Sequence, residues 1–368
     1  MASSARRAGW RVIAIDLFGD EDLQEIADIV HVVPFEEYPS AIVSFLARYP
    51  SIPVCYAGGI ENSPNVIEQL SAAGILWGNQ ARDVARVRDP FQLFPLLGSK
   101  DILSPRILRD TPEVDRNVRW LRKSLRSAGG LQVNDWDGST IGPDEYLQEF
   151  VGGESCSSLF VGNDGSAQLL GSTKQLLLRD AYSGTLVARP FQYAGSIGPI
   201  KLSALMTDQL TAIGNILTSK FNMRGVFGID WINRDDQIHL IEVNPRYTAS
   251  AEVVETTLSE PVFTHHVRAF DCEEKNMAQS MFGGSHSPVI GKYILFAPRA
   301  GVVSADAPCY RHVDLDCWFA DIPQPGMRIE EGFPILTVLA AGSSEAGVKD
   351  RLTTYGREFI ERFFLNVD

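Results

Sequence analysis

The chain has 368 residues, 45% of them hydrophobic and 21% charged, which is typical of a folded globular protein and excludes a disordered one. Its formal net charge of -13 makes nucleic acid an unexpected partner, because a polyanion would be repelled. No apolar run approaches the roughly 20 residues that span a bilayer, so no membrane partner is expected. The five cysteines include no Cys-x-x-Cys pair, which favours a reducing, cytoplasmic location over a disulfide framework.

The first part of the chain, residues 1–88, alternates short apolar runs with amphipathic stretches. This pattern predicts a small α/β domain with a parallel sheet. Ligands of such sheets bind at the carboxyl ends of strands, so the loop Ala57–Asn62 could line a cleft, although its glycines are equally compatible with a simple tight turn. The expected strands are 11–16, 31–34, 52–56 and 74–78, and the expected helices are 21–29, 41–48 and 64–73.

The remainder divides into a middle part, 89–270, and a C-terminal part, 271–368. In the middle part, apolar residues between Leu202 and Leu217 recur at helical spacing, which predicts a long helix after a loop. Residues 271–287 have the composition of a linker, and short strands and a closing helix follow it. The strands expected in the middle part are 117–125, 146–151, 155–161, 225–233 and 237–245, the last two joined as an antiparallel hairpin by the turn 234–236.

This hairpin carries the most informative side chains of the chain. Asp230 and Glu242 are 12 residues apart, which across a short turn places them nearly opposite each other. Glu242, Asn244 and Arg246 alternate along one strand and therefore share one face. Asp230, Glu242 and Asn244 are thus candidate ligands for Mg²⁺, with Mn²⁺ as a second candidate, and Arg246 could hold a phosphate oxygen. A surface hairpin with solvated charges is the alternative, which the apolar neighbours disfavour.

Residues 225–232 (Gly-Val-Phe-Gly-Ile-Asp-Trp-Ile), followed by 241–246 (Ile-Glu-Val-Asn-Pro-Arg), resemble the signature of the ATP-grasp superfamily of carboxylate-amine ligases. The resemblance implies a fold of mixed α/β and α+β class: an ATP-grasp domain between an N-terminal α/β domain and a small C-terminal β-rich domain. It also implies ATP and Mg²⁺ as cofactors.

Further residues share this resemblance and receive their expected roles from it. Lys123 looks like the family's nucleotide lysine, and Gly129 and Gly130 look like its glycine-rich flap, where backbone N–H groups can approach phosphate closely. A solvated surface lysine is the alternative for Lys123. Residues that resemble the adenine-binding hinge are Gln148, Glu149, Phe150 and Val151, with Glu154 as the acceptor of ribose hydroxyls, although any edge strand offers such groups.

One departure from the family pattern concerns the first ATP-binding lysine, which usually follows an aspartate early in the domain. Here Asp89 is followed by Pro90, which carries no charge. Either Lys100, Arg88 or another residue replaces the lysine, or the nucleotide is bound more weakly.

In such enzymes ATP converts a carboxylate to an acylphosphate, which an amine then attacks to give an amide. Arg246 and Asn244 would be the catalytic residues, and small-molecule carboxylates and amines the partners. The layout looks most like small amino-acid ligases of C1-carrier biosynthesis, with glutamate or another amino acid as substrate. The short glycine flap argues against carboxylation of biotin. An inactive ATP-binding module and a kinase acting on a hydroxyl are the alternatives, and a homodimer is a candidate assembly. His265 and His266 are expected to be helix-end or surface residues.

Overall fold

The structure, a computed structural model, describes residues 1–110, 114–115, 117–178, 189–270, 288–307, 312–314 and 316–366. Within these ranges the strands form four sheets with helices packed beside them, which confirms the predicted mixed fold class. The linker expected over 271–287 lies outside the described residues. Among the residues that are described, no helix is both long enough and apolar enough to cross a membrane.

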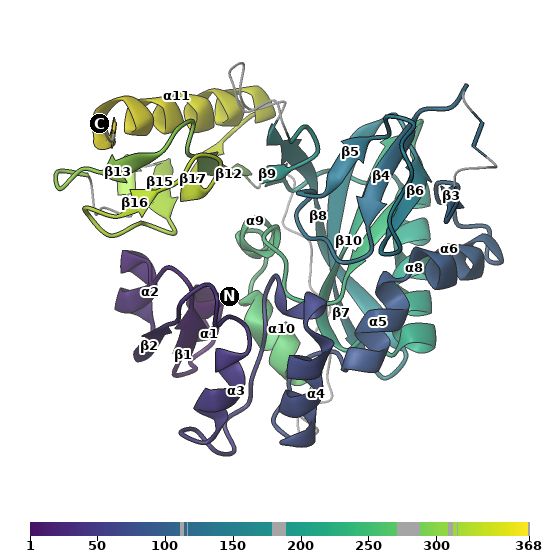
Figure 1. Cartoon of the computed structure of the whole chain (residues 1–368), viewed down its shortest axis with the longest axis horizontal. Coiled ribbons are helices and arrows are strands. Elements are labelled where there is room, and N and C mark those ends of the chain that lie inside the picture. Colours follow the sequence, from purple (N-terminus) through teal and green to yellow (C-terminus); the bar gives the residue numbers. More distant parts are fainter. Residues whose placement is uncertain are drawn as a thin grey trace.

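The N-terminal segment is a small α/β unit at the lower left of Figure 1. Strands β1 and β2 pair in parallel, as predicted. The strands expected over 52–56 and 74–78 are wrong, because only an isolated parallel bridge joins Val54 to Leu76; Pro53, which has no N–H, limits pairing there. The elements of this unit are α1 (Ala2–Arg7), β1 (Ile13–Asp16), α2 (Glu21–Ile26), β2 (Ile29–Val32), α3 (Ala41–Leu46), the 3-10 helix η1 (Ile60–Asn62) and α4 (Pro64–Ala72). Helices α5 (Ala81–Arg88) and α6 (Pro90–Gly98) follow, and both lie further to the right in Figure 1.

A four-stranded antiparallel sheet follows, which we call the lid sheet. Its strand order is β3-β6-β4-β5. The strand predicted over 117–125 begins only at Trp120, and the one predicted over 146–151 ends at Glu149. The strands are β3 (Ile107–Leu108), β4 (Trp120–Ser124), β5 (Val133–Asp135) and β6 (Glu145–Glu149).

The largest sheet has nine strands in the order β11-β10-β7-β8-β9-β12-β17-β15-β14. The prediction of a loop between the strand at 155–161 and the long helix is wrong, because β8 and β9 lie between them. The sheet also continues into the C-terminal part, where β12 pairs with β9. The division of the chain at residues 270 and 271 therefore stays a prediction. The strands are β7 (Glu154–Asn163), β8 (Ser166–Leu177), β9 (Tyr193–Gly198), β10 (Gly225–Arg234), β11 (Gln237–Asn244), β12 (Val289–Phe296), β14 (His312–Asp314), β15 (Cys317–Ala320) and β17 (Pro334–Gly342).

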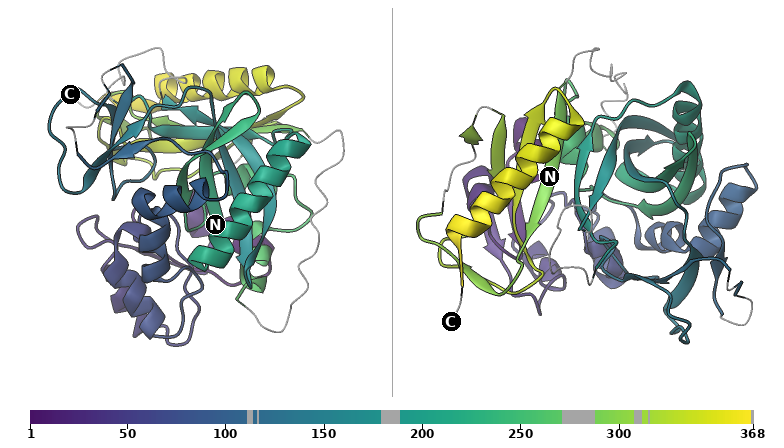
Figure 2. Two further views of the ribbon diagram at one scale, coloured as in Figure 1. Left: turned by 90° about the vertical axis from the view of Figure 1, so that its right-hand side faces the viewer. Right: turned by 90° about the horizontal axis from the view of Figure 1, so that it is seen from above.

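Helix α8 (Ala204–Phe221) is the predicted long helix, and it lies across the large sheet (Figure 2, left). It begins where the Ser203 side chain accepts a hydrogen bond from the Met206 N–H, and it ends at Asn222 in the left-handed conformation. The predicted apolar stripe is buried against β7, β10 and β11 in one hydrophobic cluster, which includes Met206, Leu210, Ile213 and Leu217. This cluster holds the hairpin β10–β11 on a rigid base.

The closing helix predicted at the C-terminus is α11 (Glu345–Phe363), which packs on β12 and β17 (Figure 2, right). A small sheet of order β16-β13-β18 lies beside it. Two short helices follow β11: α9 packs on β8, β9 and β12, and α10 packs on α1 and β10. These elements are β13 (Gly301–Val303), β16 (Arg328–Ile329), β18 (Phe364–Asn366), α9 (Ala251–Glu255) and α10 (Val262–Arg268).

Candidate active site

The hairpin β10–β11 brings the two predicted carboxylates together. Asp235 and Asp236 both have positive φ, 54° and 59°, so the two-residue turn matches the twist of the strands. Asp230 is paired with Glu242 in the ladder, as predicted, and the register shifts immediately afterwards. A register shift of this kind is typical of a β-bulge, which re-aims side chains beside active sites.

Asp230 is held by three neutral donors. Its Oδ1 accepts hydrogen bonds from Ser157 Oγ at 2.9 Å and from Gln175 Nε2 at 2.8 Å, and its Oδ2 accepts one from Asn244 Nδ2 at 3.1 Å. None of these donors carries a charge. The pKa of Asp230 is raised to about 6, first because the surrounding protein desolvates the carboxylate and second because Glu242 is close; hydrogen bonds from Ser157 and Asn244 offset this only in part.

This arrangement is suited to a divalent cation. Asp230, whose pKa is raised, and the neighbouring Glu242 together present negative charge that a cation would neutralise. In the described residues, no cluster of three or more His, Cys, Asp or Glu side chains could hold a metal ion by itself. Mg²⁺ commonly takes one or two carboxylates and completes its shell with phosphate oxygens and water. Asp230 and Glu242 therefore fit Mg²⁺ that arrives with a nucleotide.

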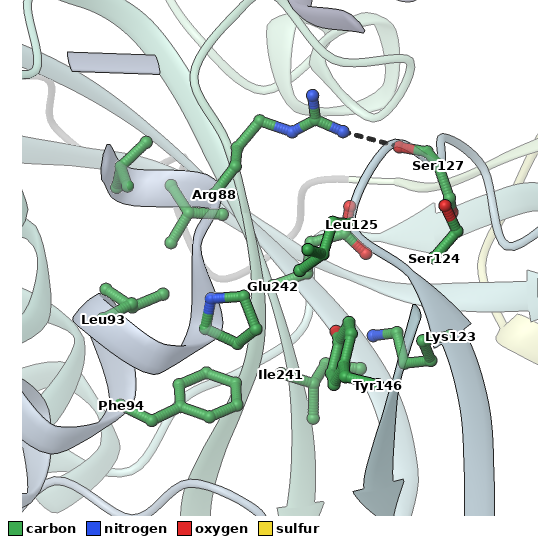
Figure 3. Close-up of a pocket in the computed structure, with 13 residues that line it drawn as sticks. Arg88, Leu93, Phe94, Lys123, Ser124, Leu125, Ser127, Tyr146, Ile241 and Glu242 are labelled. Atoms are coloured by element: carbon green, nitrogen blue, oxygen red, sulfur yellow. Dashed lines mark hydrogen bonds between the residues drawn. The ribbon is translucent and has the colours of Figure 1, made fainter. Parts of the chain in front are cut away.

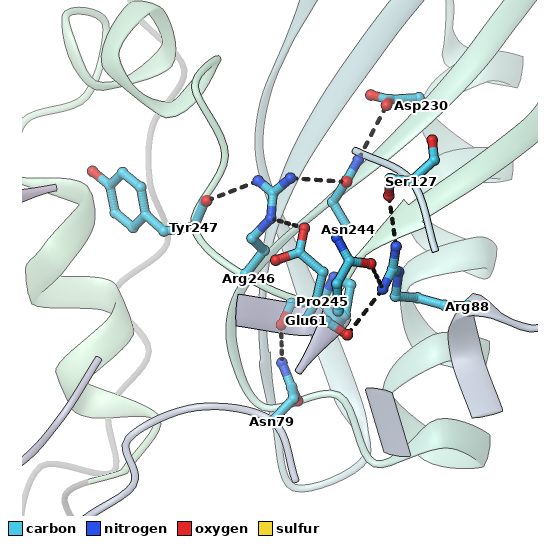
Figure 4. A network of polar contacts seen from close by, with 10 residues as sticks. Glu61, Asn79, Arg88, Ser127, Asp230, Asn244, Pro245, Arg246 and Tyr247 are labelled. Atoms are coloured by element: carbon cyan, nitrogen blue, oxygen red, sulfur yellow. Dashed lines mark hydrogen bonds and ion pairs between the residues drawn. The ribbon is translucent and has the colours of Figure 1, made fainter. Parts of the chain in front are cut away.

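Arg246 lies two residues beyond the end of β11, and hydrogen bonds hold its side chain on three sides (Figure 4). Its Nε donates to Glu61 Oε1 at 2.6 Å, and its two terminal nitrogens donate to the carbonyl of Tyr247 at 3.2 Å and to Asn244 Oδ1 at 3.4 Å. Asn244 thus bridges Asp230 and Arg246, although Arg246 lies beyond the strand on whose face it was predicted. In this arrangement the amide oxygen of Asn244 faces Arg246.

Lys123 lies on β4 of the lid sheet and is buried, so the reading of a solvated surface lysine is wrong. Its Nζ donates to Gln148 Oε1 at 3.2 Å and lies 5.9 Å from the centre of the Tyr146 ring. Burial alone would lower the pKa of Lys123, but Tyr146, Glu242 and Asp230 raise it above its ordinary value. Lys123 therefore stays charged, next to the carboxylate pair.

A pocket lies between the lid sheet, helix α6 and strand β11 (Figure 3). Lys123 and Glu242 face each other across it, so charges of both signs line one cavity. The residues that line it are Val87, Arg88, Pro90, Leu93, Phe94, Lys123, Ser124, Leu125, Ser127, Tyr146, Ile241, Glu242 and Val243.

The predicted glycine flap is the loop between β4 and β5, but its two glycines differ. Both have positive φ, 62° for Gly129 and 74° for Gly130. A Cβ on Gly130 would lie 2.0 Å from the carbonyl oxygen of Phe191, whereas one on Gly129 would meet nothing within 4 Å. Gly130 is therefore required by packing on the segment before β9, and Gly129 is the glycine with open space beside it.

We expect Gly130→Ala to destabilise the protein more than Gly129→Ala. The left-handed conformation costs either alanine about 1–2 kcal/mol. Gly130→Ala adds a clash with backbone, worth about 1–3 kcal/mol more. Urea unfolding of both variants measures the difference in the free energy of unfolding. Equal losses would show that the segment around Phe191 moves aside.

Several hydrogen-bonding groups of the predicted hinge residues are already engaged by other parts of the chain. The N–H groups of Glu149 and Phe150 donate to the carbonyls of Arg106 and Arg119, and the Glu149 carboxylate accepts from Arg106 Nε at 2.7 Å. Gln148 is committed to Lys123. No hydrogen bond from the Val151 N–H occurs within the described residues. Glu154, at the start of β7, is exposed and forms an ion pair with Lys174 at 2.8 Å.

Arg88 occupies the region where the family's first lysine is missing. Its guanidinium donates to the carbonyl of Glu61 and to Asn62 Oδ1, both at 2.9 Å, and to the carbonyl of Ser127 in the flap at 2.7 Å. Lys100, the other candidate, is exposed beyond the end of α6. The structure explains why a proline stands at position 90. Pro90 is the first residue of α6, where proline is favoured, and the Asp89 side chain caps the helix by accepting a hydrogen bond from the Phe91 N–H.

Sequence reasoning missed several residues of the site. Ser157 and Gln175 hold Asp230, but nothing in their local pattern marks them, and Gln175 lies on the unpredicted strand β8. Glu61 could have been predicted from the sequence, because it belongs to the loop Ala57–Asn62, which is a candidate for lining a cleft.

The two adjacent histidines lie in the last turn of α10, as expected, but the surface reading is wrong because both are buried. His266 accepts from the Val226 N–H at 3.0 Å through Nδ1, and its Nε2 lies 3.1 Å from the carbonyl of Trp77. Burial lowers the pKa of His266 to about 4, so this side chain is a neutral connection between α10 and β10.

Comparisons with known proteins bear on the domain and on the fold. Residues 88–250 match the model of the ATP-grasp domain. The uncharacterized protein MJ0776 of Methanocaldococcus jannaschii is 24% identical over 231 residues, which cover 59% of this chain and 50% of that protein. The chain thus spans about half the length of this curated relative.

Two solved structures share the fold. The biotin carboxylase domain of 2-oxoglutarate carboxylase from Hydrogenobacter thermophilus, in complex with MgADP, ADP and bicarbonate, superimposes with a TM-score of 0.74 at 12% identity, covering 99% of this chain and 87% of that one. N5-carboxyaminoimidazole ribonucleotide synthetase from Thermotoga maritima gives a TM-score of 0.65 at 13% identity, covering 97% and 94%. Residues 88–250 thus match an ATP-grasp domain, and the chain shares its overall fold with these two solved structures.

Proposed function

We propose that this protein is an ATP-dependent ligase that joins a carboxylate to an amine and releases ADP and phosphate. One observation carries the proposal: the register of β10 and β11 places Asp230 opposite Glu242 and beside the buried, charged Lys123, and Asn244 connects Asp230 to Arg246. Such a set of groups neutralises a phosphoryl group in transfer.

Asp230 and Glu242 would hold Mg²⁺, and Mn²⁺ would suit the same oxygen ligands. The metal would supply charge neutralisation on the nucleotide phosphates. Lys123 adds a positive charge from the lid sheet, and the open side of Gly129 lets the flap backbone approach phosphate. Asn244 keeps Asp230 and Arg246 in fixed relation through its two hydrogen bonds.

The proposed reaction needs no covalent protein nucleophile. A carboxylate oxygen attacks the terminal phosphorus of ATP, and the bond to ADP breaks. The nitrogen of the amine then attacks the carbonyl carbon of the acylphosphate, phosphate leaves, and the nitrogen loses a proton. Arg246 would hold the anionic oxygens of the acylphosphate, because a guanidinium binds such oxygens with charge-assisted hydrogen bonds.

The substrate pair is the finer part of the proposal. We propose glutamate or another amino acid, in C1-carrier cofactor biosynthesis, on the resemblance to small amino-acid ligases. The test is ADP release over a panel of carboxylates and amines, with glutamate first. ADP that depends on both a carboxylate and an amine supports the ligase. ADP that depends on an alcohol would instead identify a kinase, and ATP binding without turnover would identify a binding module.

The assembly and location are also open to test. The Hydrogenobacter thermophilus domain is described as a dimer. We propose a homodimer for this chain as well, in the cytoplasm. Light scattering on the purified protein measures the mass of the particle, and a mass of one chain at working concentration would contradict the dimer.

We expect Arg88, not Lys100, to replace the missing lysine. Arg88→Ala removes one of the two cationic side chains that line the pocket and breaks the hydrogen bond to the Ser127 carbonyl, which is one of the contacts of the flap. The half-saturating concentration of MgATP should rise about tenfold, because that is the size of effect expected from losing one charged hydrogen bond. Lys100→Ala is the matched control and should change it less than about twofold. Titration of ADP release against MgATP compares the two, and a larger effect of Lys100→Ala would reverse the assignment.

A further inference from the structure

Glu61 has a carboxylate with one oxygen engaged and the other free. It lies in η1 of the N-terminal segment, and its side chain is only 2% exposed. Its Oε1 accepts from Arg246 Nε at 2.6 Å. Its Oε2 is buried and has no hydrogen-bond partner among the described residues. A buried carboxylate oxygen without a donor is costly, so a donor from outside the chain is expected there.

The position of Glu61 links it to the reacting groups (Figure 4). Arg246, which it holds, is the arginine proposed to bind the acylphosphate. A Cβ on Gly58 would lie 3.4 Å from the guanidinium carbon of Arg246, so the loop runs directly beside that side chain. The carbonyl of Glu61 and the side chain of Asn62 also hold Arg88, which reaches the flap. The loop therefore contacts both sides of the proposed centre.

The charges near Glu61 indicate what kind of donor fits. Burial first, and then the negative charges of Asp16 and Glu61, raise the pKa of Tyr38 to about 12, so both carboxylates lie close to this hydroxyl. Asp16 is the last residue of β1, and ligands of parallel sheets bind at such strand ends. A second anion would be repelled from this side. An ammonium group or a neutral amine, which carries N–H donors, is the matching chemistry.

We propose that Glu61 Oε2 binds the N–H groups of the amine substrate and orients its nitrogen toward the carbonyl that Arg246 holds. The proposal rests on the ligase function and deepens it, since it assigns the amine to the N-terminal side of Arg246. Glu61 thereby has two tasks: Oε1 positions Arg246 and Oε2 recognises the amine.

Glu61→Gln separates these tasks. The amide oxygen can still accept from Arg246 Nε, while the amide nitrogen places a donor where Oε2 was an acceptor. Glu255→Gln is the matched control, because Glu255 is also a buried glutamate in an ion pair with an arginine, Arg7, but it anchors α1 and the start of α10. The probes are ammonium, primary alkylamines and hydroxylamine, which converts an acylphosphate to a hydroxamate, each with the carboxylate that supports ADP release.

In Glu61→Gln we expect the half-saturating amine concentration to rise about tenfold or more. That for MgATP should change by less than about twofold, and Glu255→Gln should change neither. Unchanged amine saturation would overturn the proposal, because water would then be the partner of Oε2. Equal losses for amine and MgATP would also overturn it, since Glu61 would then act only through Arg246.

A binding measurement separates this proposal from the ligase function. If no substrate pair releases ADP, the ligase proposal fails. Calorimetric titration of the full chain with the same amines then decides the role of Glu61. Amine binding that weakens in Glu61→Gln retains the amine site without the reaction, whereas equal binding by the wild type and the variant, or none to either, rejects it.

Discussion

Glu242→Gln is expected to reduce metal-dependent ADP release by at least about 100-fold, the scale of losing one preorganised charge at a reacting phosphoryl group. Asp230→Asn should have a similar effect. Each change removes one of the two carboxylates that the hairpin places in register. With a single carboxylate left, Mg²⁺ loses half of the protein charge that would bind it. ADP release with increasing Mg²⁺, at saturating ATP and substrates, measures the loss.

The control lies on the same hairpin. Asp236→Asn makes the same chemical change in the exposed turn, where asparagine tolerates the positive φ of 59°. Its activity and its thermal unfolding should match the wild type. Glu242→Gln should also keep its fold, since no hydrogen bond to that carboxylate holds another element within the described residues. Full ADP release by Glu242→Gln would remove the carboxylate pair from the mechanism.

The hairpin could be predicted because every signal in it is local. The turn residues Asp235 and Asp236 and the alternation of apolar and polar side chains fix which residues share a face. The long helix α8 was predictable for the same reason, since its apolar stripe and its cap at Ser203 lie within one segment. In both cases the distance along the chain between interacting residues is short.

The unpredicted parts depend on contacts between distant segments. Strand β8 contains Gln175, which donates to Asp230, 55 residues further along the chain. Strand β9 is rich in small residues and pairs with β12, beyond residue 288. Conversely, the segment 52–56 has strand-like composition but finds a partner only at Val54. Tertiary pairing, not local preference, decides such strands.

The same limit applies to the site itself. Glu61 and Arg246 are 185 residues apart, and the sequence shows no connection between the loop that contains Glu61 and the hairpin. Lys123 could be assigned from its resemblance, but its burial and its bond to Gln148 could not. The roles of Arg88 and Pro90 became separable only once the cap at Asp89 and the flap contact at Ser127 were known.

Arg246→Met is expected to reduce ADP release by at least about 100-fold and to lower the free energy of unfolding by about 3–5 kcal/mol. The activity falls because the anionic oxygens of the acylphosphate lose their guanidinium. The stability falls because the Glu61 carboxylate, 2% exposed, is left buried without its cation. Arg268→Met is the control: its ion pair with Glu260 is more exposed and should cost less than about 1 kcal/mol.

A double variant separates the two effects. Glu61→Met in the Arg246→Met background removes the stranded carboxylate, and replacing both members of a buried ion pair by apolar groups is often nearly neutral. Most of the lost free energy of unfolding should therefore return, as measured by urea unfolding. ADP release should stay low, because nothing in the double variant replaces the guanidinium. If activity returned together with stability, Arg246 would be a structural residue, and the anion-binding role would have to belong to Lys123 or Arg88.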